Sequence, residues 1–336
     1  MKPSLLALTV MLALTSISAA YASDAPNFSA LLEQSRAQSP FLQEKGFDTA
    51  AAAGEARQAR ALRNPTIDAL AENLNAPPSN GASQRQTTYT ISQPLEIFGQ
   101  RGARIQAGEK GLQAAEARQH QAQVELAAAL AVAYASSEAG LIRRNIAAED
   151  VDRARGDLKA AQALVDAGKE ASLRVAQAQA GLSSAEAIAA SREAEAAAAL
   201  EQLSVLAGRA EPYSGTSESL LVREWVAPAI ANVDSASVLS AKADVDASDA
   251  VLRTERFKRA PDLNLTAGRR NFAAGGDALV VGVSLSIPLF DRNSGGISAA
   301  RARSDAARAR LDAARLQSQA DRATALARVD AAKRGL

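Results

Sequence analysis

Residues 286–296, SIPLFDRNSGG, decide the fold, because a run of alternating apolar residues meets Pro288 there and a helical tract rich in alanine and arginine follows at once. A similar stretch, SQPLEIFGQRG, occupies residues 92–102 and contains Pro94. Proline lacks the N–H donor that a β-ladder needs, so each strand should stop at its proline. We therefore predict two elbows, each of which takes the chain from a strand into a long helix.

The residues after each proline carry signals for a turn and for the start of a helix. Asn293 or Ser294 can cap the second helix, which we expect to begin near Ile297. Gly99 in the first stretch and the glycine pair at 295–296 in the second allow the backbone to turn sharply.

The first 22 residues have the layout of a secretory signal peptide. Lys2 provides a positive start, residues 5–17 are apolar, and Ala20-Tyr21-Ala22 resembles a cleavage site. The alternative is a membrane anchor, but the apolar run is too short to span a bilayer. No later stretch approaches a transmembrane helix, so a membrane-spanning part would have to be a β-barrel.

The composition argues against several kinds of site. The chain has no cysteine and a single histidine, His120, and its two methionines both lie in the leader, so we expect no metal site and no cofactor. Carboxylates are scattered, without a pair placed for acid–base chemistry, and no phosphate-binding glycine loop is present, so we expect no enzyme. The net charge of +1 gives no reason to expect nucleic acid as a partner.

The chain contains an internal repeat. Residues 39–70 align without a gap over residues 235–266, at an offset of 196 residues. The aligned positions that carry the same residue include Ser39/Ser235, Asp48/Asp244, Arg57/Arg253, Arg60/Arg256, Arg63/Arg259 and Pro65/Pro261. Both copies then continue in the order strand, loop, strand, proline, helix. We predict a duplicated unit, with residues 23–234 as the first repeat and 235–336 as the second.

The predicted strands alternate with a period of two. In the fourth, five apolar residues share one face: Leu279, Val281, Val283, Leu285 and Ile287. The first, residues 66–73, alternates less cleanly. Such segments suit either a face of a β-sandwich or the wall of a membrane barrel.

The predicted helices have lengths that match one another. Residues 105–166 would form a helix about 93 Å long, and the glycine at 168 would end it. Ser172 can cap a returning helix of about 54 Å, and residues 235–259 add about 38 Å. The chain could thus travel ~90 Å outward and return in two pieces, with the irregular segment between them beside the middle of the long helix.

These residues resemble a known family. Asn64-Pro65, residues 92–107, Pro261-Asp262-Leu263 and residues 286–302 are similar to the TolC-type outer-membrane efflux factors, and most similar to their CzcC-like cation-efflux subclass. The resemblance implies a mainly α fold with a small β part. It also implies a homotrimer in which each subunit gives four strands to a shared 12-stranded barrel, above a periplasmic tube of α-hairpins.

The resemblance further implies a passive channel, with heavy-metal cations as candidate cargo, that works with an inner-membrane pump and a periplasmic adaptor. The candidate hairpin tip for adaptor docking is Gly168, Ser172 and Leu173. The lipid would contact Tyr89, Leu279, Val281 and Val283. The candidate lumen-facing residues are Thr88, Thr90, Ser92, Ser284 and Ser286.

The second copy departs from the family pattern, because only 43 residues follow Asn293. The return helix and the second tip are missing, so we expect a C-terminally truncated chain; a naturally short form completed by a partner is the alternative. A different class of protein, a soluble periplasmic coiled-coil adaptor or structural protein, would share the exported hairpin. It should carry one hairpin within a compact β-domain, and not two copies of a strand pair.

Overall fold

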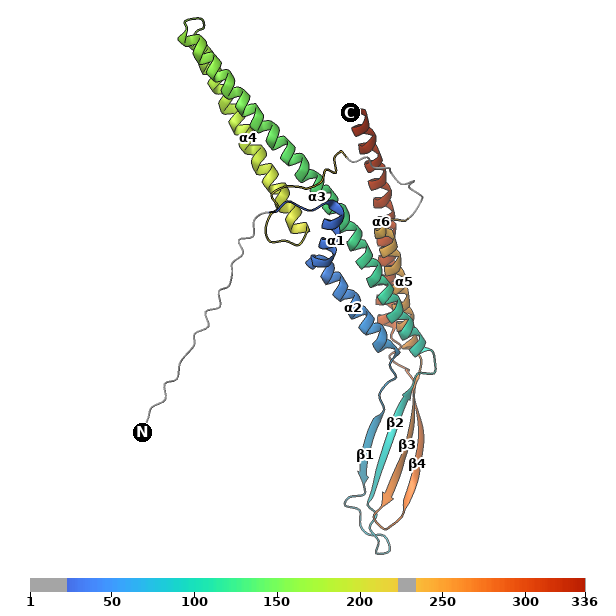
Figure 1. Ribbon diagram of the computed structural model, residues 1–336. Coiled ribbons are helices and arrows are strands. Elements are labelled where there is room, and N and C mark those ends of the chain that lie inside the picture. Colours follow the sequence, from blue (N-terminus) through green and yellow to red (C-terminus); the bar gives the residue numbers. More distant parts are fainter. Residues whose placement is uncertain (1–22, 223–233, 336) are drawn as a thin grey trace, which may run out of the picture. The chain divides into compact units, whose positions relative to one another are not determined.

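The computed structural model describes residues 23–222 and 234–335, and the predicted signal peptide lies outside them. Within this part the chain is mainly helical, with six helices and one small four-stranded antiparallel sheet (Figure 1). Contacts divide it into two compact units. The first contains the described residues up to 38 together with 129–222, and the second contains 39–128 together with 234–335.

The sheet belongs to the second unit. Its strands are β1 (Thr66–Glu72), β2 (Gln86–Leu95), β3 (Asp262–Phe272) and β4 (Asp277–Ser286), and they pair in chain order. β4 ends before Pro288, as expected. The prediction that β2 stops at its proline was wrong, because Pro94 pairs with Asn264 inside the strand. β1 reaches β2 only as far as Ser92, so Pro94 lies where the ladder is open on one side, a position that tolerates proline.

Four helices of the second unit follow the lateral order of the strands to which they connect: α2 (Pro40–Arg60), the first part of α3 (Gln100–Asp166), α5 (Ala236–Phe257) and α6 (Ser294–Gly335). α2 packs on α3 at Gly108, where a Cβ would lie 3.0 Å from the Cα of Ala56. The Thr254 hydroxyl of α5 donates to the carbonyl of Ala103 on α3 at 3.1 Å. α6 contacts α5 through Arg308, whose guanidinium lies 2.9 Å from the Asp249 carboxylate.

The two copies of the repeat form the same elements in the same order. α2 follows Ser39 and α5 follows Ser235, and the hydroxyl of Ser235 accepts a hydrogen bond from the backbone N–H of Val238. β1 and β3 begin at aligned positions. The division of the whole chain into repeats at residue 235 stays a prediction.

The elbows differ from each other in how they turn. Gly99 has a φ of +94°, and a Cβ there would lie 2.8 Å from the ring of Phe257, so this glycine is required for the turn. At the second elbow the positive φ, 52°, belongs to Asn293. The expectation that the glycine pair at 295–296 makes this turn was wrong, because both residues lie in the first turn of α6, which starts three residues earlier than predicted.

The first unit contains α1 (Phe28–Gln38), the second part of α3 and α4 (Leu173–Leu206). α3 and α4 form a hairpin (Figure 1), and the Arg155 guanidinium of α3 lies 3.5 Å from the Glu186 carboxylate of α4. A Cβ on Gly140 would lie 3.3 Å from Ala196, so the glycine lets the two helices approach closely. An apolar core joins this hairpin to α1 through Leu31, Tyr134 and Leu203, among other side chains.

The irregular segment after α4 packs beside the middle of α3. The buried carboxylate of Glu138 accepts hydrogen bonds from the Ser219 hydroxyl and, at 2.9 Å, from the backbone N–H of Leu220. The Tyr134 hydroxyl accepts the N–H of Glu218 at 3.1 Å. The described part of this segment therefore lies where the helix lengths placed it.

One expectation about apolar segments needs correction. α3 contains a stretch that is long and apolar enough to cross a membrane by length and composition. Part of that stretch is buried inside the structure, and packed helices of soluble proteins meet the same criterion.

Candidate functional site

One face of the sheet is polar, and the strand register assembles it from all four strands. Residues directly opposite each other in an antiparallel pair point to the same side. Thr90 pairs with Asp68 on β1 and with Gly268 on β3, and Ser92 pairs with Thr266. Following the same register, the five candidate lumen-facing residues, Thr88, Thr90, Ser92, Ser284 and Ser286, lie on this one polar face.

The opposite face is apolar and exposed to its surroundings. Leu279 is 81% exposed and Val283 67% exposed, although both are large apolar side chains. The register adds further exposed apolar residues from all four strands to this face: Ile67, Tyr89, Ile91, Leu265, Val281 and Leu285. A contiguous apolar surface of this kind marks a face that contacts lipid or protein.

Side-chain contacts cross the polar face. The hydroxyls of Ser92 and Thr266 are hydrogen-bonded at 3.1 Å. The Arg270 guanidinium donates to the Thr88 hydroxyl at 3.0 Å and lies 3.6 Å from the Glu72 carboxylate. As a result Thr88 is only 5% exposed, and it is Arg270 that presents a polar group at this point. The sequence analysis did not single out Arg270. Alternation along β3 places it on the same face as Thr266 and Gly268, and this was the signal that could have found it.

Three acidic residues and one basic residue of the strands lie on the polar face. The acids are Asp68, Glu72 and Asp262, and the base is Arg270. Asp262 lies 3.9 Å from Arg63. Asp68 is exposed and makes no ion pair within the described residues. The face thus has an excess of negative charge.

The turn between α3 and α4 is closed by backbone hydrogen bonds. Gly168 has a φ of +68°, its N–H donates to the Val165 carbonyl at 2.9 Å, and the N–H of Lys169 donates to the Leu164 carbonyl at 2.9 Å. These two bonds define a Schellman motif, in which glycine takes the left-handed position.

The other two candidate tip residues lie on the far side of this turn. Leu173 is the first residue of α4 and is 66% exposed. The prediction that Ser172 caps α4 through its side chain was wrong, because Ser172 has a helical φ of −54° and its hydroxyl makes no capping bond. In that conformation the Ser172 carbonyl accepts the N–H of Val175 instead.

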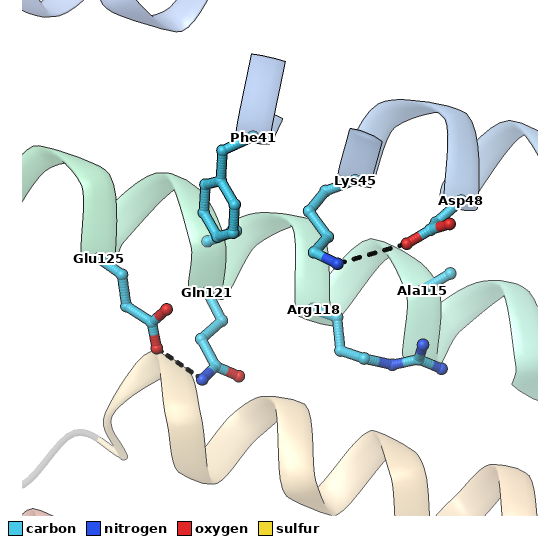
Figure 2. A pocket seen from close by; sticks show the side chains of 8 residues that line it. Phe41, Lys45, Asp48, Ala115, Arg118, Gln121 and Glu125 are labelled. Atoms are coloured by element: carbon cyan, nitrogen blue, oxygen red, sulfur yellow. Dashed lines mark hydrogen bonds and ion pairs between the residues drawn. The ribbon is translucent and has the colours of Figure 1, made fainter. Parts of the chain in front are cut away.

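A pocket of about 240 Å³ lies between α2 and α3 (Figure 2). The Lys45 ammonium lies 3.5 Å from the Asp48 carboxylate, and the Gln121 amide donates to Glu125 at 2.7 Å. The Arg118 guanidinium donates to Asp244 of α5 at 3.2 Å. The hydrogen bond with Glu44 raises the pKa of Lys45 above its ordinary value. The charged groups that line this pocket thus all have partners among neighbouring side chains.

Metal-ligating side chains do not gather anywhere in the part of the chain that the structure describes. Groups of three or more histidine, cysteine, aspartate or glutamate residues that could hold an ion are absent from residues 23–222 and 234–335. The single histidine, His120, is exposed on α3.

The sheet with two unlike faces and the long hairpin match a known family. Residues 31–209 and 228–336 match the sequence model of the family described as "Outer membrane efflux protein". The chain belongs to this family, and the resemblance to TolC-type efflux factors is confirmed.

Two relatives are similar to the chain over most of its length. The nickel and cobalt resistance protein CnrC of Cupriavidus metallidurans is 48% identical over 316 residues, which cover 93% of this chain and 76% of CnrC. The nickel-cobalt-cadmium resistance protein NccC of Alcaligenes xylosoxydans xylosoxydans is 45% identical over 328 residues, covering 96% and 74%. The chain therefore matches about three quarters of the length of each.

Among solved structures, the chain has the same fold as CusC, whose crystal structures concern its folding and transmembrane channel formation. Its TM-score is 0.73 at 19% identity, over 89% of this chain and 75% of that one. The expected mainly helical fold with a small antiparallel sheet is thereby confirmed.

Proposed function

We propose that the protein is the outer-membrane channel of a tripartite efflux system and passively conducts heavy-metal cations from the periplasm to the exterior. Family membership and the names of CnrC and NccC support this function. The observation that carries it is the sheet, in which a polar face and an exposed apolar face alternate residue by residue along β2, β3 and β4.

The proposed assembly is a homotrimer. β1 and β4 are the edges of the sheet, and neither has a further partner within the described chain. Open edges invite pairing with another chain, and closing a barrel removes them. Three copies would supply twelve strands, an even number in the range of outer-membrane barrels. The apolar face would contact lipid and the polar face would line the lumen.

The remaining parts of the proposal concern cargo, export and partners. The excess of acidic groups on the polar face suits a cation pathway better than an anion pathway. Residues 1–22 would direct export, and the helices would extend into the periplasm. The tip at Gly168, Ser172 and Leu173 would dock the periplasmic adaptor that links the channel to the inner-membrane pump.

A pair of arginine substitutions tests the two faces. Val283→Arg places a charge on the apolar face of β4, and Ser284→Arg places the same charge on the polar face one residue along. A charge facing lipid at mid-bilayer costs about 2–4 kcal/mol. We expect Val283→Arg to reduce the protein in washed outer membranes severalfold, measured by immunoblot, and Ser284→Arg to leave it near the wild-type amount.

The same membranes separate the proposal from the adaptor alternative. A carbonate wash should leave the wild-type protein in the membrane fraction, whereas a soluble periplasmic protein would be released. Equal losses for Val283→Arg and Ser284→Arg would contradict the assignment of the faces. Loss of nickel tolerance in a host that depends on this gene, when the gene is deleted, would support the cargo.

A further inference from the structure

Three exposed arginines lie together at the second elbow. A pocket of about 500 Å³ is lined by Arg259, Arg292 and Arg301, all of which are exposed. None of the three makes an ion pair within residues 23–222 and 234–335. One acid, Asp305, also lines the pocket, but its carboxylate lies 3.0 Å from Arg308; the adjacent Asp291 accepts the N–H of Asn293 at 2.9 Å.

Comparison with the first copy of the repeat shows why Arg259 lacks an ionic partner among the described residues. Arg259 aligns with Arg63 of the first copy, whose guanidinium lies 3.3 Å from the Glu96 carboxylate. The side chain of Glu96 is only 7% exposed, and it also pairs with Arg104 at 2.5 Å. When the two elbows are aligned on their prolines, Phe290 stands in the place of Glu96. The second copy has kept the arginine and lacks the carboxylate that neutralises it.

An exposed apolar segment adjoins these arginines in the sequence. Beyond β4 the apolar residues continue through Ile287 and Leu289 to Phe290, which is 99% exposed. Arg292 follows two residues later. A free inorganic anion would need only the arginines, whereas a phospholipid presents a phosphate beside acyl chains. The combination of apolar and cationic groups fits the phospholipid.

We propose that Arg259, Arg292 and Arg301 bind the phosphate of an anionic phospholipid in the periplasmic leaflet of the outer membrane, with Leu289 and Phe290 against its acyl chains. This inference rests on the proposed function, which puts the apolar face of the sheet in the bilayer and the helices in the periplasm. The elbow then lies at the level of the headgroups, where aromatic and basic side chains are favoured. Guanidinium groups suit this task because they bind phosphate oxygens in bidentate fashion.

Binding of defined lipids to the purified protein tests the proposal. The full chain, delipidated in detergent, is titrated with phosphatidylglycerol and with phosphatidylethanolamine, and bound lipid is counted by native mass spectrometry. We expect preference for phosphatidylglycerol in the wild type. The double variant Arg292→Gln/Arg301→Gln should bind phosphatidylglycerol roughly 30-fold more weakly. The control Arg310→Gln/Arg328→Gln removes the same charge from exposed positions further along α6 and should bind like the wild type.

A second variant examines the apolar part of the site. Phe290→Ser should weaken binding of phosphatidylglycerol severalfold and leave binding of the soluble headgroup glycerophosphoglycerol unchanged. Equal binding of the two lipids, or equal loss in the double variant and its control, would overturn the proposal. So would displacement of the lipid by an equal concentration of inorganic phosphate.

Two further outcomes separate this inference from the proposed function. Release of the wild type by carbonate would remove the proposed function itself, whereas a membrane-embedded wild type without lipid preference removes only the lipid site. A different outcome would be a double variant that assembles poorly, but whose assembled fraction binds phosphatidylglycerol normally. In that case the arginines contact a second copy of the chain, and the lipid proposal is wrong.

Discussion

Gly268 lies where β3 approaches the backbone of β2 closely. A Cβ at this position would lie 2.2 Å from the carbonyl oxygen of Tyr89, a distance that backbone atoms cannot relieve without moving apart. Gly282 on β4 has no such neighbour, because its nearest contact would be the Cβ of Thr266 at 3.9 Å. Both glycines lie inside strands, but only Gly268 has a neighbour too close to leave room for a Cβ.

Gly268→Ala should therefore destabilise the sheet, by about 1–3 kcal/mol as for other forced overpacking, whereas Gly282→Ala should be nearly neutral. The stability of the assembled protein is measured by the temperature at which it loses its migration on a semi-native gel. Equal midpoints for the two variants would show that the close approach of β2 and β3 does not constrain the fold.

Single residues were predictable where one rule governs them. Alternation by twos put Thr90, Ser284 and Ser286 on one face correctly, because a strand permits only two orientations. It could not tell that Arg270 covers Thr88, because that depends on a neighbouring strand joined across 182 residues. The role of Ser172 was missed for a similar reason, since a serine before a helix is compatible with several backbone conformations.

Among the contacts between elements, the one between α5 and the start of α6 depends on a carboxylate. The Asn293 side-chain amide donates to the Glu255 carboxylate at 2.7 Å and to the Glu255 carbonyl at 2.9 Å. A hydrogen bond from Lys258 first, and then the one from Asn293, hold the pKa of Glu255 below its ordinary value of 4.5. The ionised form is therefore the one that the folded protein favours.

Because the pKa of Glu255 is lower in the folded state than in the unfolded state, its contribution to stability is present above pH 4.5 and is lost as the pH falls through the folded pKa. We expect Glu255→Gln to lower the denaturation midpoint relative to the wild type at pH 7, and the difference to shrink as the pH falls below 4.5. Glu149→Gln, at an exposed carboxylate of α3, is the control and should show no such dependence.

Element boundaries followed from sequence at α5, which was predicted to start at residue 235 and begins at Ala236, directly after Ser235. They failed where packing overrides propensity. Pro94 stays within β2 because the ladder is already open on one side of it. α1 was not anticipated, because its burial depends on Tyr134 and Leu203, which lie far along the chain.

For the molecule as a whole, the proposed trimer would bring three copies of Asp68 around one lumen. A unit charge about 8 Å from a passing ion in water changes its energy by about 0.5 kcal/mol. Asp68→Asn removes all three charges from the trimer and should therefore reduce the cation-to-anion permeability ratio by more than about twofold, measured as a reversal potential in a planar bilayer under a salt gradient. Asp277→Asn, on the opposite face of β4, should leave the ratio unchanged; a larger effect there would reverse the assignment of the lumen.

The overall architecture was the most predictable level, because the same order of helices and strands can be read from both copies of the repeat. Ser39 and Ser235 directly precede equivalent helices, and Pro94 and Pro288 lie at corresponding elbows. Each copy therefore supports the interpretation of the other. The divergence between copies was not predictable in this way. The pairing of Glu96 with Arg63 and Arg104 becomes visible only when the chain is folded, and with it the absence of a counterpart at Phe290.

The turn at Gly168 has a consequence for how such a protein can change its associations. Its closure uses only main-chain groups of residues 164–169, so none of the surrounding side chains is needed to hold the bend. Substitutions at Lys169, Glu170 or Leu173 can therefore accumulate without unfolding the hairpin, provided that the glycine is kept. In the proposed assembly, such drift would let one rigid scaffold acquire a new docking preference through surface chemistry alone.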